Sequence, residues 1–180
     1  MERQVKHILL CGNRRTGRSS MVRKLTEASG LPLCGFMTRT LNKREDGYHE
    51  IFMFPYGAQE LRASEDCHIG DCNTRERVIH NEVFNTLGVK LLEPKPGAVL
   101  VMDEVGFMEA QAEAFCDAVL ERLSNSTPVI AAVRTSIDTP FIQKVLASEN
   151  ACVVRMEPER FDEIYEALLP IVSSWKTKVL

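Results

Sequence analysis

The stretch VKHILLCGNRRTGRSSMV, residues 5–22, joins a short apolar run to a helical pattern through a loop with two glycines. Val5–Cys11 is rich in apolar residues, as expected of a buried strand. From Gly17 onward, apolar residues recur at the spacing of a helix until Gly30 ends the pattern. We therefore expect a strand, a loop and a helix in immediate succession, as at the start of many α/β folds.

The loop between this strand and helix fits the phosphate-binding pattern G-x-x-x-x-G-K-[ST], the P-loop or Walker A motif, except that Arg18 replaces the lysine. Its glycines let backbone N–H groups point inward, and the helix N-terminus adds positive potential there. The Ser19 hydroxyl is placed to bind Mg²⁺. The predicted phosphate-binding residues are Gly12, Asn13, Arg14, Arg15, Thr16, Gly17, Arg18, Ser19 and Ser20.

Three arginines make this loop basic. Arg14, Arg15 and Arg18 lie together in a chain with 22 lysines and arginines and 25 acidic residues. A turn with a purely structural role between a strand and a helix would also use two glycines. The local positive charge favours a loop that binds an anion. Because a guanidinium is planar and bulkier than an ammonium, we expect Arg18 to preserve phosphate binding and to align the phosphates less well for transfer.

A second motif follows the apolar run Ala98–Met102, which is typical of a central parallel strand. It ends in Asp103 and Glu104, a Walker B pattern in which the aspartate would hold the Mg²⁺ shell and the glutamate would polarise a water molecule. Acidic residues that simply end a strand at the surface are the alternative. Because open α/β sheets bind ligands at the carboxyl ends of their strands, the loop and this pair are expected to meet in one crevice.

The rest of the chain alternates short apolar runs with amphipathic ones, which predicts an α/β fold with a mostly parallel sheet flanked by helices. Asp46-Gly47 predicts an additional antiparallel hairpin between two β-rich stretches, and residues 55–75 suggest a loop. The expected strands are 34–40, 48–54, 98–102, 128–133 and 152–156, and the expected helices are 78–92, 111–123, 140–147 and one from residue 160.

Composition narrows the class of protein. The chain has 180 residues, 44% of them hydrophobic and 26% charged, which suits one globular domain spanning residues 1–180. The formal net charge of −3 gives no reason to expect nucleic acid or an anionic membrane as a partner. No apolar run is long enough to span a membrane, and six cysteines are too few for a disulfide scaffold. These features favour a cytoplasmic protein with free thiols.

Three segments together resemble the small stand-alone P-loop nucleoside-triphosphatases, the THEP-type NTPases: Gly12–Ser20, Gly35–Arg39 and Asp103–Glu109. The similarity continues to Glu159-Arg160 and so covers nearly the whole chain. It implies a RecA-like P-loop fold with added antiparallel strands, and Mg²⁺-dependent hydrolysis in which Glu104 activates water. Arg160 resembles an arginine of the family that would approach the nucleotide, although a surface ion pair is an equal expectation. Arg18 and Phe107 depart from the family pattern, where lysines are usual.

The expected activity is binding of ATP, GTP or another nucleoside triphosphate with Mg²⁺, followed by slow hydrolysis to nucleoside diphosphate and phosphate. Glu104 and Arg18 are the predicted catalytic residues, and Ser19 and Asp103 the predicted metal ligands. Two alternatives remain: a regulatory module that binds nucleotide with little hydrolysis, and a small-molecule kinase. A metal site at Cys67, His68, Cys72 and His80 is not expected, because the C-x-x-x-x-C spacing is looser than in structural zinc sites.

Overall fold

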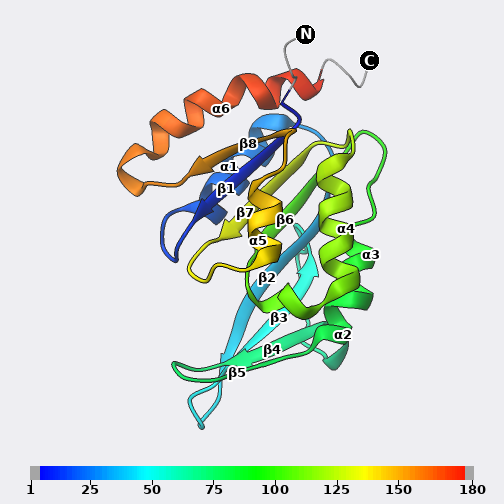
Figure 1. Ribbon diagram of the computed structural model, residues 1–180, viewed down its shortest axis with the longest axis vertical. Coiled ribbons are helices and arrows are strands. Elements are labelled where there is room, and N and C mark those ends of the chain that lie inside the picture. Colours follow the sequence, from blue (N-terminus) through cyan, green and yellow to red (C-terminus); the bar gives the residue numbers. More distant parts are fainter. Residues whose placement is uncertain (1–4, 177–180) are drawn as a thin grey trace.

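One eight-stranded sheet runs through the computed structural model of the chain, which describes residues 5–176 (Figure 1). The strand order is β5-β4-β3-β2-β6-β7-β1-β8. In this order, the five strands β2, β6, β7, β1 and β8 pair in parallel with their neighbours. The strands β5, β4, β3 and β2 pair antiparallel. The strands are β1 His7–Gly12, β2 Leu33–Lys43, β3 His49–Pro55, β4 His68–Cys72, β5 Arg77–Ile79, β6 Val99–Val105, β7 Val129–Arg134 and β8 Ala151–Arg155.

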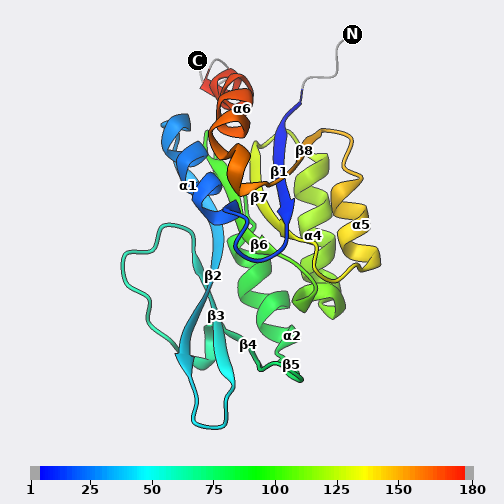
Figure 2. The same cartoon turned by 90° about the vertical axis from the view of Figure 1, so that its left-hand side faces the viewer.

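Helices cover both faces of the parallel part of the sheet (Figure 2). One face carries α1 (Arg18–Ser29) and α6 (Phe161–Lys176), which contact each other. The other face carries α4 (Glu113–Ser124), α5 (Pro140–Leu146) and a continuous helical segment made of α2 (Asn81–Val83), a π-helical stretch (Phe84–Gly88) and α3 (Val89–Leu91). Short 3-10 turns lie at Glu65–Cys67, Met108–Gln111 and Pro158–Arg160.

Two apolar cores follow from this layering, because successive residues of a strand point to opposite faces. In β1, Ile8 and Leu10 pack under α1 and α6, whereas Leu9 packs under α4 and α5. All three side chains are fully buried. The strands that were predicted from continuous apolar runs are therefore those that are covered on both faces.

The predicted hairpin is present, and β2 is the strand that joins it to the parallel sheet. Residues Leu33–Met37 of β2 pair with β6, and Phe36–Lys43 pair with β3. At the hairpin tip, Gly47 has φ 86 and donates its N–H to the carbonyl of Arg44 at 3.0 Å. The antiparallel strands thus extend the sheet beyond the helices that cover its centre (Figure 1).

Two predictions in this region were wrong. Residues 55–75 were expected to form a loop, yet they contain β4, and the helix expected from residue 78 begins only at Asn81 because Arg77–Ile79 form β5. Both strands are short and pair only within the antiparallel extension. Gly70 permits the pairing, because a Cβ there would overlap the carbonyl oxygen of Val78. Such strands have no strong local pattern, since their stability comes from cross-strand neighbours.

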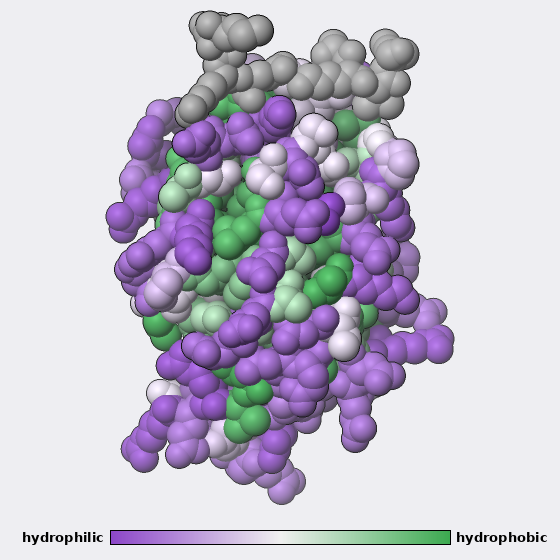
Figure 3. Space-filling model, turned by 45° about the vertical axis from the view of Figure 1, so that its right-hand side comes forward, coloured by the Kyte–Doolittle hydropathy of each residue, from purple (hydrophilic) through white to green (hydrophobic). Residues whose placement is uncertain are grey.

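None of the helices among residues 5–176 is long and apolar enough to span a bilayer. In Figure 3, hydrophilic residues form most of the visible face and hydrophobic residues appear as separate patches. Cys11, Cys34, Cys67, Cys72, Cys116 and Cys152 are all free thiols.

Candidate functional site

The loop after β1 has the geometry of an anion site. Gly12, Arg15 and Gly17 have φ angles of 153, 60 and 83, which turn the chain sharply from β1 into α1. Inside the loop, the Thr16 hydroxyl donates to the carbonyl of Asn13 at 2.9 Å. Gly17 caps α1 without a side-chain hydrogen bond, so backbone N–H groups of the first turn are left to bind a ligand.

Ser19 and Asp103 meet at the carboxyl edge of the sheet, although they are 84 residues apart in the sequence. The Ser19 hydroxyl donates to Oδ1 of Asp103 at 2.8 Å. Asp103 is only 4% exposed, and burial raises its pKa while the hydrogen bond from Ser19 opposes that rise. A hydroxyl and a carboxylate are the oxygen ligands that Mg²⁺ prefers, so this pair fits the predicted metal site.

Glu104 forms ion pairs with two arginines from different elements. Nη2 of Arg18 lies 3.0 Å from Oε2 of Glu104, and Nη1 of Arg134 lies 3.6 Å from Oε1. Arg18 is only 6% exposed, and its Nε and Nη1 atoms are buried without a hydrogen-bond partner in the described structure. Because unsatisfied buried donors are costly, these two nitrogens favour an anion that would accept from them.

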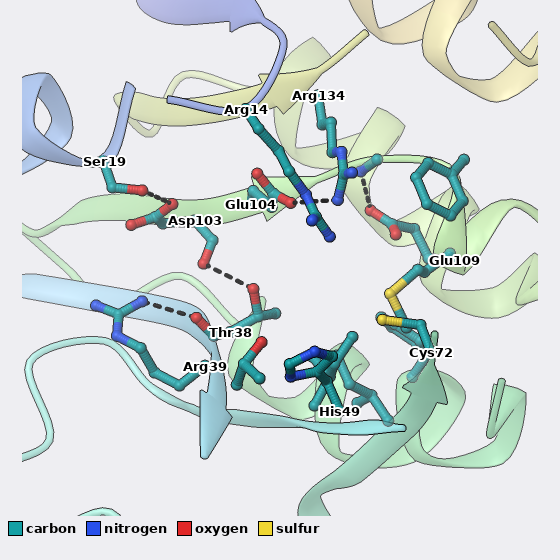
Figure 4. Close-up of a pocket in the computed structure, with 17 residues that line it drawn as sticks. Arg14, Ser19, Thr38, Arg39, His49, Cys72, Asp103, Glu104, Glu109 and Arg134 are labelled. Atoms are coloured by element: carbon teal, nitrogen blue, oxygen red, sulfur yellow. Dashed lines mark hydrogen bonds and ion pairs between the residues drawn. The ribbon is translucent and has the colours of Figure 1, made fainter. Parts of the chain in front are cut away.

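Asp103 and Glu104 both face the same space, although consecutive strand residues normally point to opposite sides. The register of β6 against β7 shifts between Asp103 and Val105, and such irregularities redirect side chains next to functional sites. Figure 4 shows the two carboxylates side by side, with Ser19 reaching Asp103 and Arg134 reaching Glu104. The carboxylates are therefore available to one ligand.

A cavity of about 440 Å³ opens beside this cluster. It is bounded on one side by the loop and the carboxylates, and on the other by the antiparallel extension, where His49 and Cys72 lie across from Arg14 (Figure 4). The lining residues are Arg14, Ser19, Thr38, Arg39, Thr40, His49, Ile51, Ile69, Cys72, Phe84, Asp103, Glu104, Gly106, Phe107, Met108, Glu109 and Arg134.

The predicted site residues other than Arg160 divide into two groups. The cavity is lined by Arg14, Ser19, Asp103 and Glu104, and Arg18 contacts the site through its ion pair with Glu104. The others belong to the loop or to the start of α1 and do not line this cavity: Gly12, Asn13, Arg15, Thr16, Gly17 and Ser20.

Arg160 lies apart from the cavity. It is exposed at the 3-10 turn before α6, where it pairs with Glu163 at 2.6 Å and with Glu157 at 3.5 Å. The next residue, Phe161, adjoins the loop, because a Cβ placed on Gly17 would lie 3.4 Å from its ring. The structure thus brings this segment to the loop and engages the arginine itself in surface ion pairs.

Sequence reasoning missed Arg134 and Thr38 as site residues. Arg134 ends β7, beside β6, and the signal that could have identified it is its position at the carboxyl end of a predicted parallel strand. Its guanidinium lies 5.1 Å from the centroid of the Phe107 ring, and that of Arg77 lies 4.5 Å from the same ring. Phe107, where lysine is usual in the resembling family, therefore packs against two arginines at the cavity.

Glu109 is a further group at this site. It is 3% exposed, its carboxylate accepts from the N–H of Gly106, and burial raises its pKa to about 8. A carboxyl group with such a pKa is largely protonated at neutral pH. It therefore adds no strong negative charge to a cavity that also contains Asp103 and Glu104.

The family model and the two relatives that match this sequence all concern nucleoside-triphosphatases. Residues 7–169 match the model of a family described as NTPase. The chain is 27% identical to the cancer-related nucleoside-triphosphatase homologue of Mus musculus, in an alignment that covers 96% of this chain and 99% of that protein. The homologue of the same name from Bos taurus is also 27% identical, over 66% of this chain and 70% of that protein.

Two solved structures have similar folds. The crystal structure of THEP1 from the hyperthermophile Aquifex aeolicus aligns with a TM-score of 0.72 at 18% identity, covering 92% of this chain and 98% of that chain. The solution structure of a human cancer-related nucleoside triphosphatase aligns with a TM-score of 0.63 at 22% identity, covering 94% and 98%. At these identities the likeness concerns the fold, and it confirms the predicted P-loop α/β architecture.

Proposed function

The chain belongs to the NTPase family, as its resemblance to the THEP-type nucleoside-triphosphatases implied, and we propose that it binds a nucleoside triphosphate with Mg²⁺ and hydrolyses it slowly to nucleoside diphosphate and phosphate. The phosphates would bind at the loop between Gly12 and Ser20, which carries three arginines and is followed by the free backbone N–H groups at the start of α1. ATP and GTP are the first candidates for the substrate.

The observation that carries this proposal is the hydrogen bond between Ser19 and Asp103 at 2.8 Å. It joins the phosphate-binding loop to the end of β6 and provides the two oxygen ligands expected for Mg²⁺ in a P-loop enzyme. When bound there, Mg²⁺ would neutralise part of the negative charge of the phosphates. Asp103 would hold the ion as a charged carboxylate, and the hydrogen bond from Ser19 favours this charged form of its side chain.

Glu104 is the residue we assign to water activation. Its carboxylate lines the cavity next to Asp103, where it would be placed to orient a water molecule. Arg18 now pairs with this carboxylate, and a triphosphate in the loop would compete for the guanidinium through its unpartnered Nε and Nη1 atoms. Phosphate binding would thereby weaken the Arg18–Glu104 pair and free the carboxylate to orient and polarise water.

Two further assignments belong to the same proposal. Arg160 lies next in sequence to Phe161, which adjoins Gly17, so it could turn from Glu163 to a bound nucleotide.

The free cysteines support a reducing, cytoplasmic compartment.

A regulatory module that holds nucleotide with little hydrolysis is the second candidate. The Arg18–Glu104 pair favours it, because a glutamate that stays bound to the loop arginine cannot act on water. A small-molecule kinase is the third candidate, favoured by the cavity that continues from Glu104 to His49 and Cys72 and could hold a phosphate acceptor.

The deciding experiment measures nucleotide binding, nucleoside diphosphate and free phosphate in parallel, over a panel of nucleotides with and without Mg²⁺. Equal amounts of diphosphate and phosphate, formed only with Mg²⁺, support hydrolysis. Binding without turnover supports the regulatory module. Diphosphate formed without matching phosphate, in a mixture of hydroxyl-bearing metabolites, supports transfer to an acceptor. Failure of every nucleotide to bind contradicts the proposal.

A further inference from the structure

Three potential metal ligands gather on the antiparallel extension, outside the cavity lining. His68 and Asp71 belong to β4, and His80 immediately precedes α2. Each offers one ligand atom, and the three atoms lie within 4.8 Å of one another. Nε2 of His68 is 3.1 Å from Oδ1 of Asp71. The sequence places His80 in a different element from the other two, so only the fold creates this cluster.

Each histidine ring is held in place by a separate contact. The ring of His68 stacks on Phe52, with centroids 4.8 Å apart and an interplanar angle of 23°. Nδ1 of His80 lies 2.8 Å from the carbonyl oxygen of His68, which can only accept, so this nitrogen carries the proton. The lone pair of a neutral His80 is therefore on Nε2. Metal-binding histidines are commonly oriented by such a backbone hydrogen bond on the other ring nitrogen.

Asp71 supplies a buried carboxylate between two basic groups. It is 7% exposed, and besides His68 it has Nη1 of Arg44 at 3.8 Å from Oδ1. Arg44 is itself held by Asp46 at 2.6 Å, so its longer contact with Asp71 is the weaker of the two. The carboxylate is therefore available to share a cation with the imidazoles.

We propose that His68, Asp71 and His80 bind one divalent transition-metal ion, of which Zn²⁺ suits the ligands best. Two imidazoles and a carboxylate select borderline metals over Mg²⁺ and Ca²⁺, which prefer oxygen ligands alone. In tetrahedral zinc sites neighbouring ligand atoms are about 3.3 Å apart. Nε2 of His68 and Oδ1 of Asp71 are already close to this separation, at 3.1 Å. All three ligand atoms lie within 4.8 Å of one another, so no distance between them would have to shorten by more than about 1.5 Å. Water would complete the coordination.

The ion would fix the outer part of the extension. It would tie β4 to the residue before α2, and β4 also carries Ile69 and Cys72, which line the cavity. This role differs from that of Ser19 and Asp103, and it does not depend on nucleotide binding. The cysteines that drew attention in the sequence, Cys67 and Cys72, do not belong to the cluster.

The test is a titration of the full chain, stripped of metal by a chelator, with Zn²⁺ in the presence of millimolar Mg²⁺ to occupy the Ser19–Asp103 site. We expect one zinc ion per chain by equilibrium dialysis, and a higher melting temperature with zinc. Binding should weaken at least ~10-fold in His80→Gln and in Asp71→Asn. His49→Gln in β3 and Cys72→Ser in β4, which change other potential ligands of the antiparallel extension, should bind zinc as the parent does.

A second measurement requires no variant. X-ray absorption of the zinc-loaded parent should show nitrogen and oxygen ligands with imidazole scattering and without sulfur. Failure of the parent to bind zinc, unchanged binding in both ligand variants, or sulfur in the coordination shell would overturn the proposal.

Discussion

Arg18, at the start of α1, forms a 3.0 Å ion pair with Glu104 at the end of β6. The pair joins the residue that replaces the usual P-loop lysine to the residue assigned to water activation. Because Arg18 is buried and has two further nitrogens without a partner, it is held ready for an additional anion. The balance between Glu104 and phosphate at this guanidinium is therefore expected to control turnover.

Arg18→Lys is expected to raise the rate of hydrolysis several-fold. A lysine places a compact charge near the β- and γ-phosphates and lacks the planar fork that holds Glu104, so charge stabilisation in the transition state improves. The measurement is phosphate release at saturating nucleotide.

Weaker binding in Arg18→Lys with negligible hydrolysis would instead support the regulatory module, in which the arginines act as a phosphate clamp. Arg18→Ala is the control and should weaken triphosphate binding under either hypothesis. A variant that binds as tightly as the parent would show that this side chain does not contact phosphate.

Glu104→Gln is expected to lower hydrolysis ~10²-fold or more, with nucleotide binding nearly unchanged. Glutamine preserves the shape but cannot polarise water as a carboxylate does. Single-turnover phosphate release and a separate binding titration distinguish the two effects. Glu113→Gln, at an exposed position in α4, is the matched control and should behave like the parent. Parental activity in Glu104→Gln would remove this residue from the mechanism.

Nucleotide should raise the melting temperature, and Mg²⁺ should increase the effect. A ligand that binds only the folded state stabilises it by RT ln(1 + [L]/Kd), about 2.7 kcal/mol at a hundredfold excess over Kd. Ser19→Ala should lose the increment that Mg²⁺ adds, because it removes one of the two proposed metal ligands. Ser20→Ala should keep it. An unchanged melting curve of the parent at millimolar nucleotide would contradict the nucleotide site.

Glu109 should make the folded protein less stable as the pH rises. Its ordinary pKa of 4.5 is raised to about 8 in the folded state by burial, so between these values the folded chain binds the proton that the unfolded chain has lost. The free energy of unfolding should therefore fall as pH increases across this window, by at most about 1.4 kcal/mol per pH unit from this group.

Glu109→Gln should flatten that part of the stability profile relative to the parent. Urea unfolding at several pH values provides the measurement. Burial also raises the pKa of Asp103, which likewise lowers the stability of the folded protein as the pH rises. This contribution is the same in parent and variant, so the difference between their slopes reports on Glu109. Equal slopes would show that Glu109 is ionised in the folded state.

Local patterns accounted for much of the parallel sheet. The apolar runs before Gly12 and Asp103 predicted β1 and β6, because strands covered on both faces need apolar side chains at every position. The loop between β1 and α1, with Ser19 near the start of the helix, was predictable for a similar reason, since the P-loop pattern sets its residues at fixed spacing along the chain.

The antiparallel extension and the pairing of side chains were decided by tertiary structure. β4 forms because β3 offers it a partner, β5 forms because β4 does, and nothing in residues 68–79 alone requires a strand.

By itself, the sequence determined the glycine-bounded loop after β1, the acidic end of β6 and the alternation of strands and helices in the parallel part of the sheet, because each depends on residues close together in the chain. Only the fold decided that Arg134 joins Arg18 at Glu104 and that His80 meets His68 and Asp71. These contacts join residues from different elements, and their geometry depends on how the strands align rather than on any local spacing.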